Sequence, residues 1–179
     1  MAKDKLIVLL RGINVSGKNM IKMAALKAAL KNAGLPNAET YLQSGNLVVS
    51  TNMHESDTAE QVSTVIKNEF EYDVPAICIA AKNFEKMVLQ NPFAKQYHGE
   101  EKSIYYTFFK ETVVADTLLD AKYFRENEQL KIEKNIAYLY CPEGYGTTKL
   151  SNSFLEKKFK TLATTRNHQT SMALIEMSK

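Results

Sequence analysis

Strand-like and helix-like segments follow the order β-α-β-β-α-β twice along the 179 residues, and one more helix-like segment comes after the second set. Short apolar runs mark the strands, apolar residues at three- and four-residue spacing mark the helices, and Gly, Pro and Asn mark the junctions. This pattern predicts an α+β protein of two tandem ferredoxin-like (βαββαβ) units with antiparallel sheets and an extra C-terminal helix. We expect an N-terminal unit over residues 1–81, a linking helix and loop over 82–102, and a C-terminal unit with the final helix over 103–179.

The first unit opens with a strand from Lys5 to Arg11, followed by a helix with an apolar stripe. Gly34 and Pro36 end this helix, as a C-terminal glycine and a following proline do. The stripe consists of Met23, Leu26, Leu30 and Ala33. The later elements are, in order, strands Glu39–Gln43 and Leu47–Thr51, a helix Asp57–Phe70 and a strand Val74–Ala80. Since the first strand is apolar at every position from Leu6 to Leu10, the other unit or a partner chain should cover its second face, which leaves room for a homo-oligomer.

The second unit follows a linking helix from Asn83 to Gln90 and a polar segment. Its expected elements are a strand Ile104–Phe109, a helix Thr112–Ala121, hairpin strands Gln129–Glu133 and Ile136–Cys141, a helix Ser153–Lys160 and a strand Leu162–Thr165. The spacing of Ser153 and Glu156 is that of a capping box. The final helix should be capped by Asn167.

Composition favours a soluble globular protein, since 45% of the residues are hydrophobic and 24% are charged. The apolar run near the N-terminus is too short for a signal-peptide core or a membrane span, so we expect a cytoplasmic protein without a membrane partner. Cys78 and Cys141 lie in strand-like runs with no second ligand at metal spacing. We therefore expect two buried thiols in a reducing compartment, no metal site and no cofactor.

The net charge of +3 is too small to indicate nucleic-acid binding by itself, but it is unevenly distributed. Residues 1–35 contain seven basic and one acidic residue, residues 36–140 contain ten and sixteen, and residues 141–179 contain six and three. Both ends are basic and the middle is acidic. A positive face forms if the ends meet in space, but lysines spread over solvated helix faces would give the same counts.

The turn between the first strand and the first helix has the spacing of a phosphate-binding loop. Gly12 to Lys18 reads G-x-x-x-x-G-K, and free N–H groups at a helix start attract anions. Asn19 stands where Mg²⁺ coordination requires Ser or Thr, which disfavours an NTPase. Anion binding without hydrolysis and a plain turn both remain open. The candidate ligand-binding residues here are Arg11, Gly12, Asn14, Gly17, Lys18 and Asn19.

Topology places further polar loops beside one another. In a βαββαβ unit the first turn and the central hairpin share an end, so Ser44 and Asn46 join the candidates; Ser44 lacks the glycine of a nucleophile elbow, which favours a hairpin turn. In the second unit, the segments 144–149 and 164–170 likewise share an end. There we expect Lys149, Arg166 and Asn167 to form a second basic edge, with Asn167 also capping the last helix.

Aromatic residues and histidines in the second unit allow other interpretations. Tyr and Phe side chains on its first and third strands occupy the positions where an RNA-recognition module stacks bases, but the sequence pattern of such a module is absent, which favours rings that fill the interface behind the sheet. The three histidines, His54, His98 and His168, have no partner carboxylate at readable spacing.

Four segments carry a family resemblance: LLRGINVSGKN (residues 9–19), TYLQSGNLVV (40–49), YGTTKL (145–150) and TTRNHQT (164–170). They resemble the bacterial family catalogued as domain of unknown function 1697. The resemblance implies tandem ferredoxin-like units and no established activity. Family members often look like G-I-N-V-G-G where this chain has Ser16, which suggests that the position does not need the backbone freedom of glycine. Where this chain has His168 they often have Trp, so a role that requires an indole is in doubt.

Three hypotheses follow for the function. In the first, the chain is a binding module for an anionic ligand, such as a nucleotide, a phosphorylated metabolite or a nucleic-acid backbone. In the second, it is an enzyme in which Arg11 and Lys18 stabilise developing negative charge, with a base that the sequence does not identify. In the third, the motifs serve only turns and interfaces of a structural or interaction protein.

Overall fold

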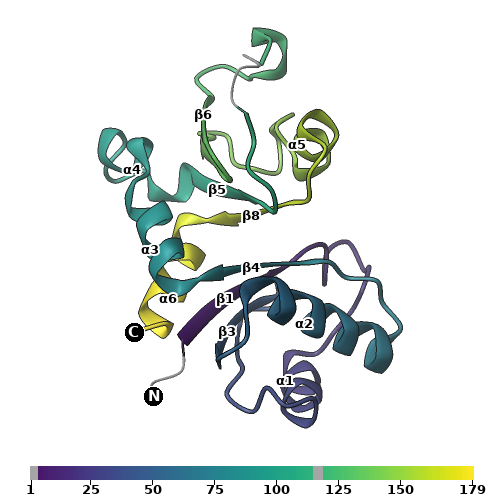
Figure 1. The fold of residues 1–179 in the computed structure, drawn as a ribbon. Helices are drawn as coiled ribbons and strands as arrows, with labels where there is room; N and C mark the ends of the chain where they lie inside the picture. Colours follow the sequence, from purple (N-terminus) through teal and green to yellow (C-terminus); the bar gives the residue numbers. More distant parts are fainter. Residues whose placement is uncertain (1–3, 115–118) are drawn as a thin grey trace. The chain divides into compact units, whose positions relative to one another are not determined.

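The computed structural model describes residues 4–114 and 119–179, and in them two four-stranded antiparallel sheets (Figure 1). The chain divides into two compact units, Met1–Glu85 with Leu174–Lys179, and Lys86–Ala173. The last turn of the final helix therefore belongs with the first unit. The two sheets have equivalent strand orders, β2-β3-β1-β4 and β6-β7-β5-β8, as two tandem ferredoxin-like units require.

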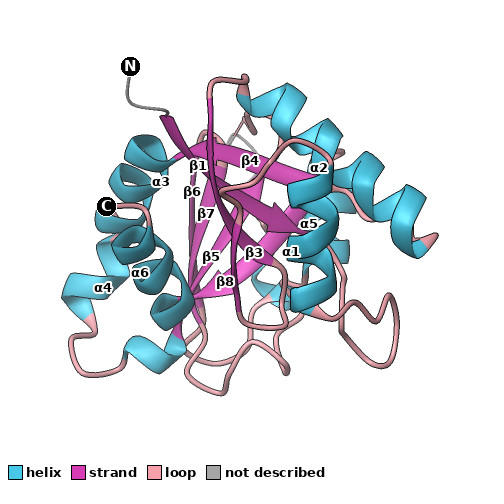
Figure 2. Ribbon diagram, turned by 90° about the horizontal axis from the view of Figure 1, so that it is seen from below, coloured by secondary structure: helices cyan, strands magenta, loops and turns pink. Residues whose placement is uncertain are grey.

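The first unit contains the six elements that the sequence predicts. They are β1 (Asp4–Leu10), α1 (Met23–Asn32), β2 (Glu39–Tyr41), β3 (Asn46–Thr51), α2 (Glu55–Phe70) and β4 (Ala76–Ala80). Helices α1 and α2 lie side by side on one face of this sheet (Figure 2). Gly34, with a φ of 91°, ends α1, and the Leu35 amide returns to the Leu30 carbonyl at 2.9 Å.

The core of the first unit forms where the helix stripes meet alternate residues of β1. Val8 and Leu10 pack with Leu26, Leu30 and other buried side chains of α1 and α2. Ile7 and Leu9, which point to the opposite face of the strand, are also 0% exposed. The uninterrupted apolar run thus corresponds to a strand buried on both faces.

The second unit begins inside α3 (Ala81–Leu89), the helix that starts directly after β4. Its elements are α4 (Pro92–Gln96), a 3₁₀ turn η1 (Glu101–Ser103), β5 (Ile104–Phe109), a 3₁₀ turn η2 (Ala121–Tyr123), β6 (Gln129–Glu133), β7 (Ile136–Tyr140), α5 (Asn152–Phe159), β8 (Ala163–Asn167) and α6 (His168–Met177). The predicted start of the linking helix at Asn83 is two residues late, because α3 begins at Ala81. Asn91 caps α4, accepting the Phe93 amide at 2.8 Å.

The helix predicted over Thr112–Ala121 is not present in its described part. Residues 112–114 and 119–120 are non-helical, and residues 115–118 lie outside the described residues. Val113 donates its backbone N–H to the Lys134 carbonyl at 2.8 Å and is buried in the core. This bond ties the segment to the β6–β7 hairpin, and β-branched residues such as Thr112 and Val113 give the competing helix little support.

Of the two helix caps predicted in the second unit, one is wrong and the other is confirmed. Ser151, two residues before the predicted cap Ser153, caps α5 by accepting the Phe154 amide at 3.3 Å. The Glu156 carboxylate accepts the amide of Ala163 at 3.0 Å, so the predicted capping box is wrong. Asn167 caps α6 through the Thr170 amide at 2.8 Å, as predicted.

Candidate functional site

The loop that follows β1 folds into a small hairpin of its own. Val15 and Lys18 form an antiparallel bridge, and the Lys18 amide donates to the Val15 carbonyl at 3.0 Å. The two residues at its tip have positive φ, 51° at Ser16 and 74° at Gly17, as a type I′ turn requires. The inference that the Ser16 position needs no unusual backbone freedom is therefore wrong. Lys18 is presented at an exposed hairpin tip.

Two asparagine side chains hold the base of this hairpin. Asn14 accepts the Ile21 amide at 2.8 Å and donates to the Ile21 carbonyl at 3.0 Å, while Asn19 donates to the Gly12 carbonyl at 2.9 Å. Both asparagines have positive φ, 51° and 47°, which this residue type tolerates better than most. Their amides thus fix the shape of the loop.

Asn14 also joins this loop to the β2–β3 hairpin. The Asn14 amide donates to the Gln43 carbonyl at 2.7 Å, and the Leu10 amide donates to the Gly45 carbonyl at 2.8 Å. The backbones approach so closely that a Cβ on Gly45 would lie 2.7 Å from Ile13 Cδ1. The predicted juxtaposition of these two loops is confirmed. Residues 11–22 and 41–46 are called the two-loop surface below.

The β2–β3 hairpin is held by the buried side chain of Asn46, which donates to the Tyr41 carbonyl at 2.8 Å and to the Ser44 hydroxyl at 3.0 Å. Positive φ occurs at Leu42 and Gly45. The Ser44 hydroxyl makes a turn contact, in keeping with the hairpin interpretation. Asn46, at 0% exposure, contributes to folding of the turn.

The geometry rules out the phosphate-binding loop of an NTPase. In such a loop the Gly-Lys pair leads directly into a helix whose first N–H groups hold the phosphates. Here Lys18 lies on a hairpin tip and α1 begins only at Met23. The sheet is also antiparallel throughout, whereas that loop belongs to a parallel one. The NTPase interpretation is therefore wrong.

Several apolar side chains on the two-loop surface are exposed, as Lys18 is. Val15 is 58% exposed, Met20 59% and Leu42 54%. Leu42 also has a φ of 56°, which is unusual for a leucine. Arg11 is half-buried at the edge of the same surface, and its backbone amide donates to the Pro75 carbonyl at 2.9 Å. The surface combines cationic and apolar groups on a backbone that is fixed by hydrogen bonds.

The second basic edge is not formed as predicted. Arg166 lies on β8 and is 7% exposed, and its guanidinium donates to the Thr164 hydroxyl and to the Thr165 carbonyl, both at 2.8 Å. Lys149 is exposed and donates to the Lys122 carbonyl at 3.0 Å. Burial in the sheet therefore removes Arg166 from any exposed edge with Lys149. Asn167 is occupied as the cap of α6.

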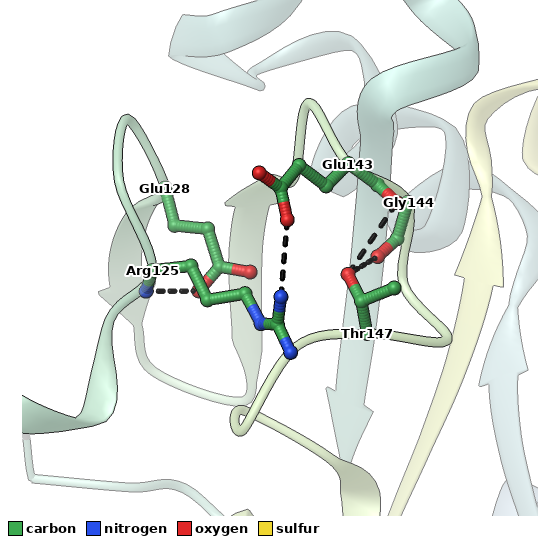
Figure 3. A network of polar contacts seen from close by, with 5 residues as sticks. All are labelled: Arg125, Glu128, Glu143, Gly144 and Thr147. Carbon is green, nitrogen blue, oxygen red and sulfur yellow. Dashed lines mark hydrogen bonds and ion pairs between the residues drawn. The ribbon is translucent and has the colours of Figure 1, made fainter.

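The loop that contains Gly144 is held by local polar contacts (Figure 3). Thr147 donates to the Gly144 carbonyl at 2.9 Å, and the Arg125 guanidinium pairs with Glu143 at 3.1 Å. The Arg125 amide donates to the Glu128 carboxylate at 2.9 Å. These contacts account for the polar residues of this loop as turn-forming groups.

A buried tyrosine and a histidine form a contact that sequence inspection missed. The Tyr106 hydroxyl lies 2.8 Å from His168 Nδ1, and the two residues are 62 positions apart in sequence. Burial lowers the pKa of His168, while the nearby Glu101 carboxylate acts in the opposite direction. Burial also raises the pKa of Tyr106 to about 12. No spacing in the sequence indicates that these two residues form a pair.

The pH dependence of stability should report on this pair. A histidine whose folded pKa lies below its ordinary value of 6.5 contributes stability that is complete above that value and is lost as pH falls through the folded pKa. We expect the melting temperature to fall between pH 7 and pH 5 more in the wild type than in His168→Gln, as measured by circular dichroism. Identical pH profiles would show that His168 is not the titrating group.

The aromatic residues of the second sheet are inside the protein. Tyr106 and Phe108 are 0% exposed and Tyr138 is 1% exposed. The rings of Tyr106 and Tyr138 meet edge to face with centroids 6.2 Å apart, and the Tyr138 hydroxyl donates to the Met87 carbonyl. Base stacking requires exposed rings. The RNA-recognition alternative is therefore wrong for these residues, and the packing interpretation is confirmed.

The thiols carry no sign of nucleophilic or metal-binding chemistry. Burial raises the pKa of both Cys78 and Cys141 to about 12, so each is protonated at neutral pH. Within residues 4–114 and 119–179, no three His, Cys, Asp or Glu side chains are grouped as a metal site.

Comparison with known proteins agrees with this fold. The family model described as "Protein of unknown function (DUF1697)" matches residues 4–138. The chain belongs to this family. A search of curated proteins gives no match to this DUF1697 chain. A solved structure, that of the conserved bacterial protein SP0830 from Streptococcus pneumoniae, is similar over 99% of this chain and 100% of the other, with 24% identity and a TM-score of 0.74.

This likeness establishes the fold. It extends over both ferredoxin-like units. In the described part of the chain, no helix has the length and apolar character needed to cross a bilayer.

Proposed function

We propose that the chain binds a phosphate-bearing ligand on the two-loop surface, with Lys18 and Arg11 contacting phosphate oxygens. The supporting observation is the side chain of Asn14, which bonds to both Ile21 and Gln43 and so fixes the Lys18 hairpin relative to the neighbouring loop. A surface that is already ordered loses less conformational entropy on binding than a flexible one.

Charge supports an anionic ligand. No acidic residue occurs between Lys5 and Glu39, whereas five basic residues do: Arg11, Lys18, Lys22, Lys27 and Lys31. The four lysines are exposed. The excess of basic residues in this part of the sequence attracts phosphate groups over a distance of about 10 Å at moderate salt.

The exposed apolar side chains add a second kind of contact. Val15, Met20 and Leu42 lie on the same two loops as Lys18 and are each more than half exposed. An apolar part of the ligand, such as a nucleobase, would cover them and gain about 25 cal/mol for each Å² buried. This combination of charged and apolar contacts fits a nucleotide or a nucleic-acid strand better than inorganic phosphate.

Binding is favoured over turnover by the composition of the surface. Residues 11–22 and 41–46 contain no Asp, Glu, His or Cys. A general base for reaction near neutral pH is drawn mainly from those residue types. The enzyme hypothesis would therefore need a base from elsewhere in the protein.

Removal of one charge tests the proposal. Lys18→Ala is expected to weaken binding of ATP or of a short single-stranded RNA about tenfold, which corresponds to about 1.4 kcal/mol, because an ion pair with phosphate is lost. Titration calorimetry at low and high salt would measure this change. Affinity for RNA alone that falls steeply with salt would identify a nucleic-acid backbone, and salt-resistant affinity for ATP would identify a nucleotide.

Lys67→Ala is the matched control, since Lys67 is an exposed lysine of the same unit on α2. It should leave both affinities within about twofold of the wild type, a change of less than 0.5 kcal/mol. Equal weakening by the two substitutions, or no binding of either probe by the wild type, would contradict the proposal.

A further inference from the structure

A cavity of about 910 Å³ lies in the first unit at the end of the sheet where β1 begins and β4 ends. The two-loop surface follows the other end of β1, after Leu10. Lys5 from β1, Lys82 from α3 and Lys179 near the end of the chain all line the cavity. The strand β1 thus connects two separate cationic regions.

The charges of two of these lysines are not neutralised locally. Lys5 Nζ contacts the Met177 carbonyl at 3.5 Å, which is a neutral group. Within the described residues, neither Lys5 nor Lys82 forms an ion pair with a carboxylate. Lys179, in contrast, pairs with Glu176 at 2.5 Å. Lys5 and Lys82 are therefore the cations available to a ligand in this cavity.

Glu55, the acidic residue that lines the cavity, accepts a hydrogen bond from the backbone. The Glu55 carboxylate accepts the Ala80 amide at 2.5 Å, which joins the start of α2 to the end of β4. The other polar lining groups, His54 and Ser56, can donate hydrogen bonds to an anion. With Lys179 paired to Glu176, the lining carries two further lysines, Lys5 and Lys82, against the one carboxylate of Glu55.

Apolar side chains also line the cavity. Leu6 of β1 is 3% exposed, and Met53 is 36% exposed. Both line the same cavity as Lys5. A ligand that fits this lining has a charged head and a short apolar portion.

We propose that this cavity binds a small organic phosphate, with the phosphate group held by Lys5 and Lys82 and its apolar portion against Leu6 and Met53. The site is distinct from the two-loop surface and does not depend on it. A volume of about 910 Å³ is in the range of pockets that enclose small-molecule ligands. The net positive lining selects an anion, and the apolar wall favours an alkyl or aryl phosphate over inorganic phosphate.

The test is a titration of the ¹⁵N-labelled full chain with butyl phosphate, followed by amide chemical shifts. Saturable shifts are expected at Ser56 and Lys82, with affinity about fivefold higher than for inorganic phosphate because of the apolar contact. Lys82→Gln and Lys5→Gln should each weaken binding about five- to tenfold. Lys82 is exposed, so its substitution keeps the test valid if Lys5→Gln impairs folding.

The control variant is Lys67→Gln, which replaces an exposed lysine in the last turn of α2 and should bind butyl phosphate as the wild type does. Lys18→Ala should also leave this affinity unchanged, which separates the two sites. No saturable shift at Ser56 and Lys82, or equal weakening by Lys67→Gln, would overturn the proposal. Butyrate that binds as tightly as butyl phosphate would overturn the assignment of a phosphate ligand.

Discussion

Replacing Gly45 by alanine is expected to lower the free energy of unfolding by about 3 kcal/mol, from overpacking and backbone strain together. The new methyl group would lie 2.7 Å from Leu10 Cβ and from Ile13 Cδ1. Leu10 Cβ cannot move without its strand, so the hairpin or β1 must shift. The φ of 78° adds strain for any residue with a Cβ. Urea denaturation followed by circular dichroism measures the change.

Gly12→Ala separates the two causes. Gly12 has a φ of 73°, close to that of Gly45, but a Cβ there would meet no atom within 4 Å. The variant carries the backbone strain without the clash, so about 1 kcal/mol is expected. If both variants lose the same stability, the close approach of the two loops at Gly45 is not what the protein depends on.

Replacing Asn14 by glycine is expected to cost about 3 kcal/mol in the free energy of unfolding, since each lost hydrogen bond contributes about 1 kcal/mol. Its side chain makes three such bonds, two with Ile21 and one with Gln43. Glycine tolerates the φ of 51°, so the measurement reports the side chain rather than backbone strain. Urea denaturation gives the energy, and hydrogen exchange at the amide of Ile21 reports the loop.

Asn19→Gly is the matched substitution in the same loop. Asn19 has a φ of 47°, and its side chain makes one bond, to the Gly12 carbonyl. A loss smaller than that of Asn14→Gly by about 2 kcal/mol is expected. Under the proposed function, Asn14→Gly should also weaken ATP or RNA binding, because Lys18 would no longer be held against the neighbouring loop. Equal stability losses in the two variants would contradict the role given to Asn14.

Most of the fold could be predicted because its signals are local. The apolar run Leu6 to Leu10 indicates a strand buried on both faces, and Gly34 with Pro36 indicates the end of α1. The segment that begins at Thr112 was predicted wrongly since its backbone is held by a distant carbonyl, that of Lys134. A contact between residues far apart in sequence leaves no periodic pattern to read.

The candidate site was likewise predicted correctly in part and wrongly in part. Topology alone places residues 11–19 beside 43–46, and the hydrogen bond from Asn14 to Gln43 agrees with it. The motif G-x-x-x-x-G-K suggests a cradle at a helix start, but the chain forms a hairpin there. Spacing of residues does not fix backbone conformation, and positive φ at Asn14, Ser16, Gly17 and Asn19 redirects the loop.

By itself the sequence determined the order of the strands, their ferredoxin-like pairing in both sheets and the buried stripes of α1 and α2, because apolar periodicity and turn chemistry identify these elements. Only the tertiary structure decided which polar residues are available to a ligand. Arg166 is buried in its sheet, Asn14 and Asn19 hold a loop, and Lys18 is exposed at a hairpin tip. Burial and hydrogen-bond partners depend on atoms brought together from distant parts of the chain, so the residue type alone cannot specify them.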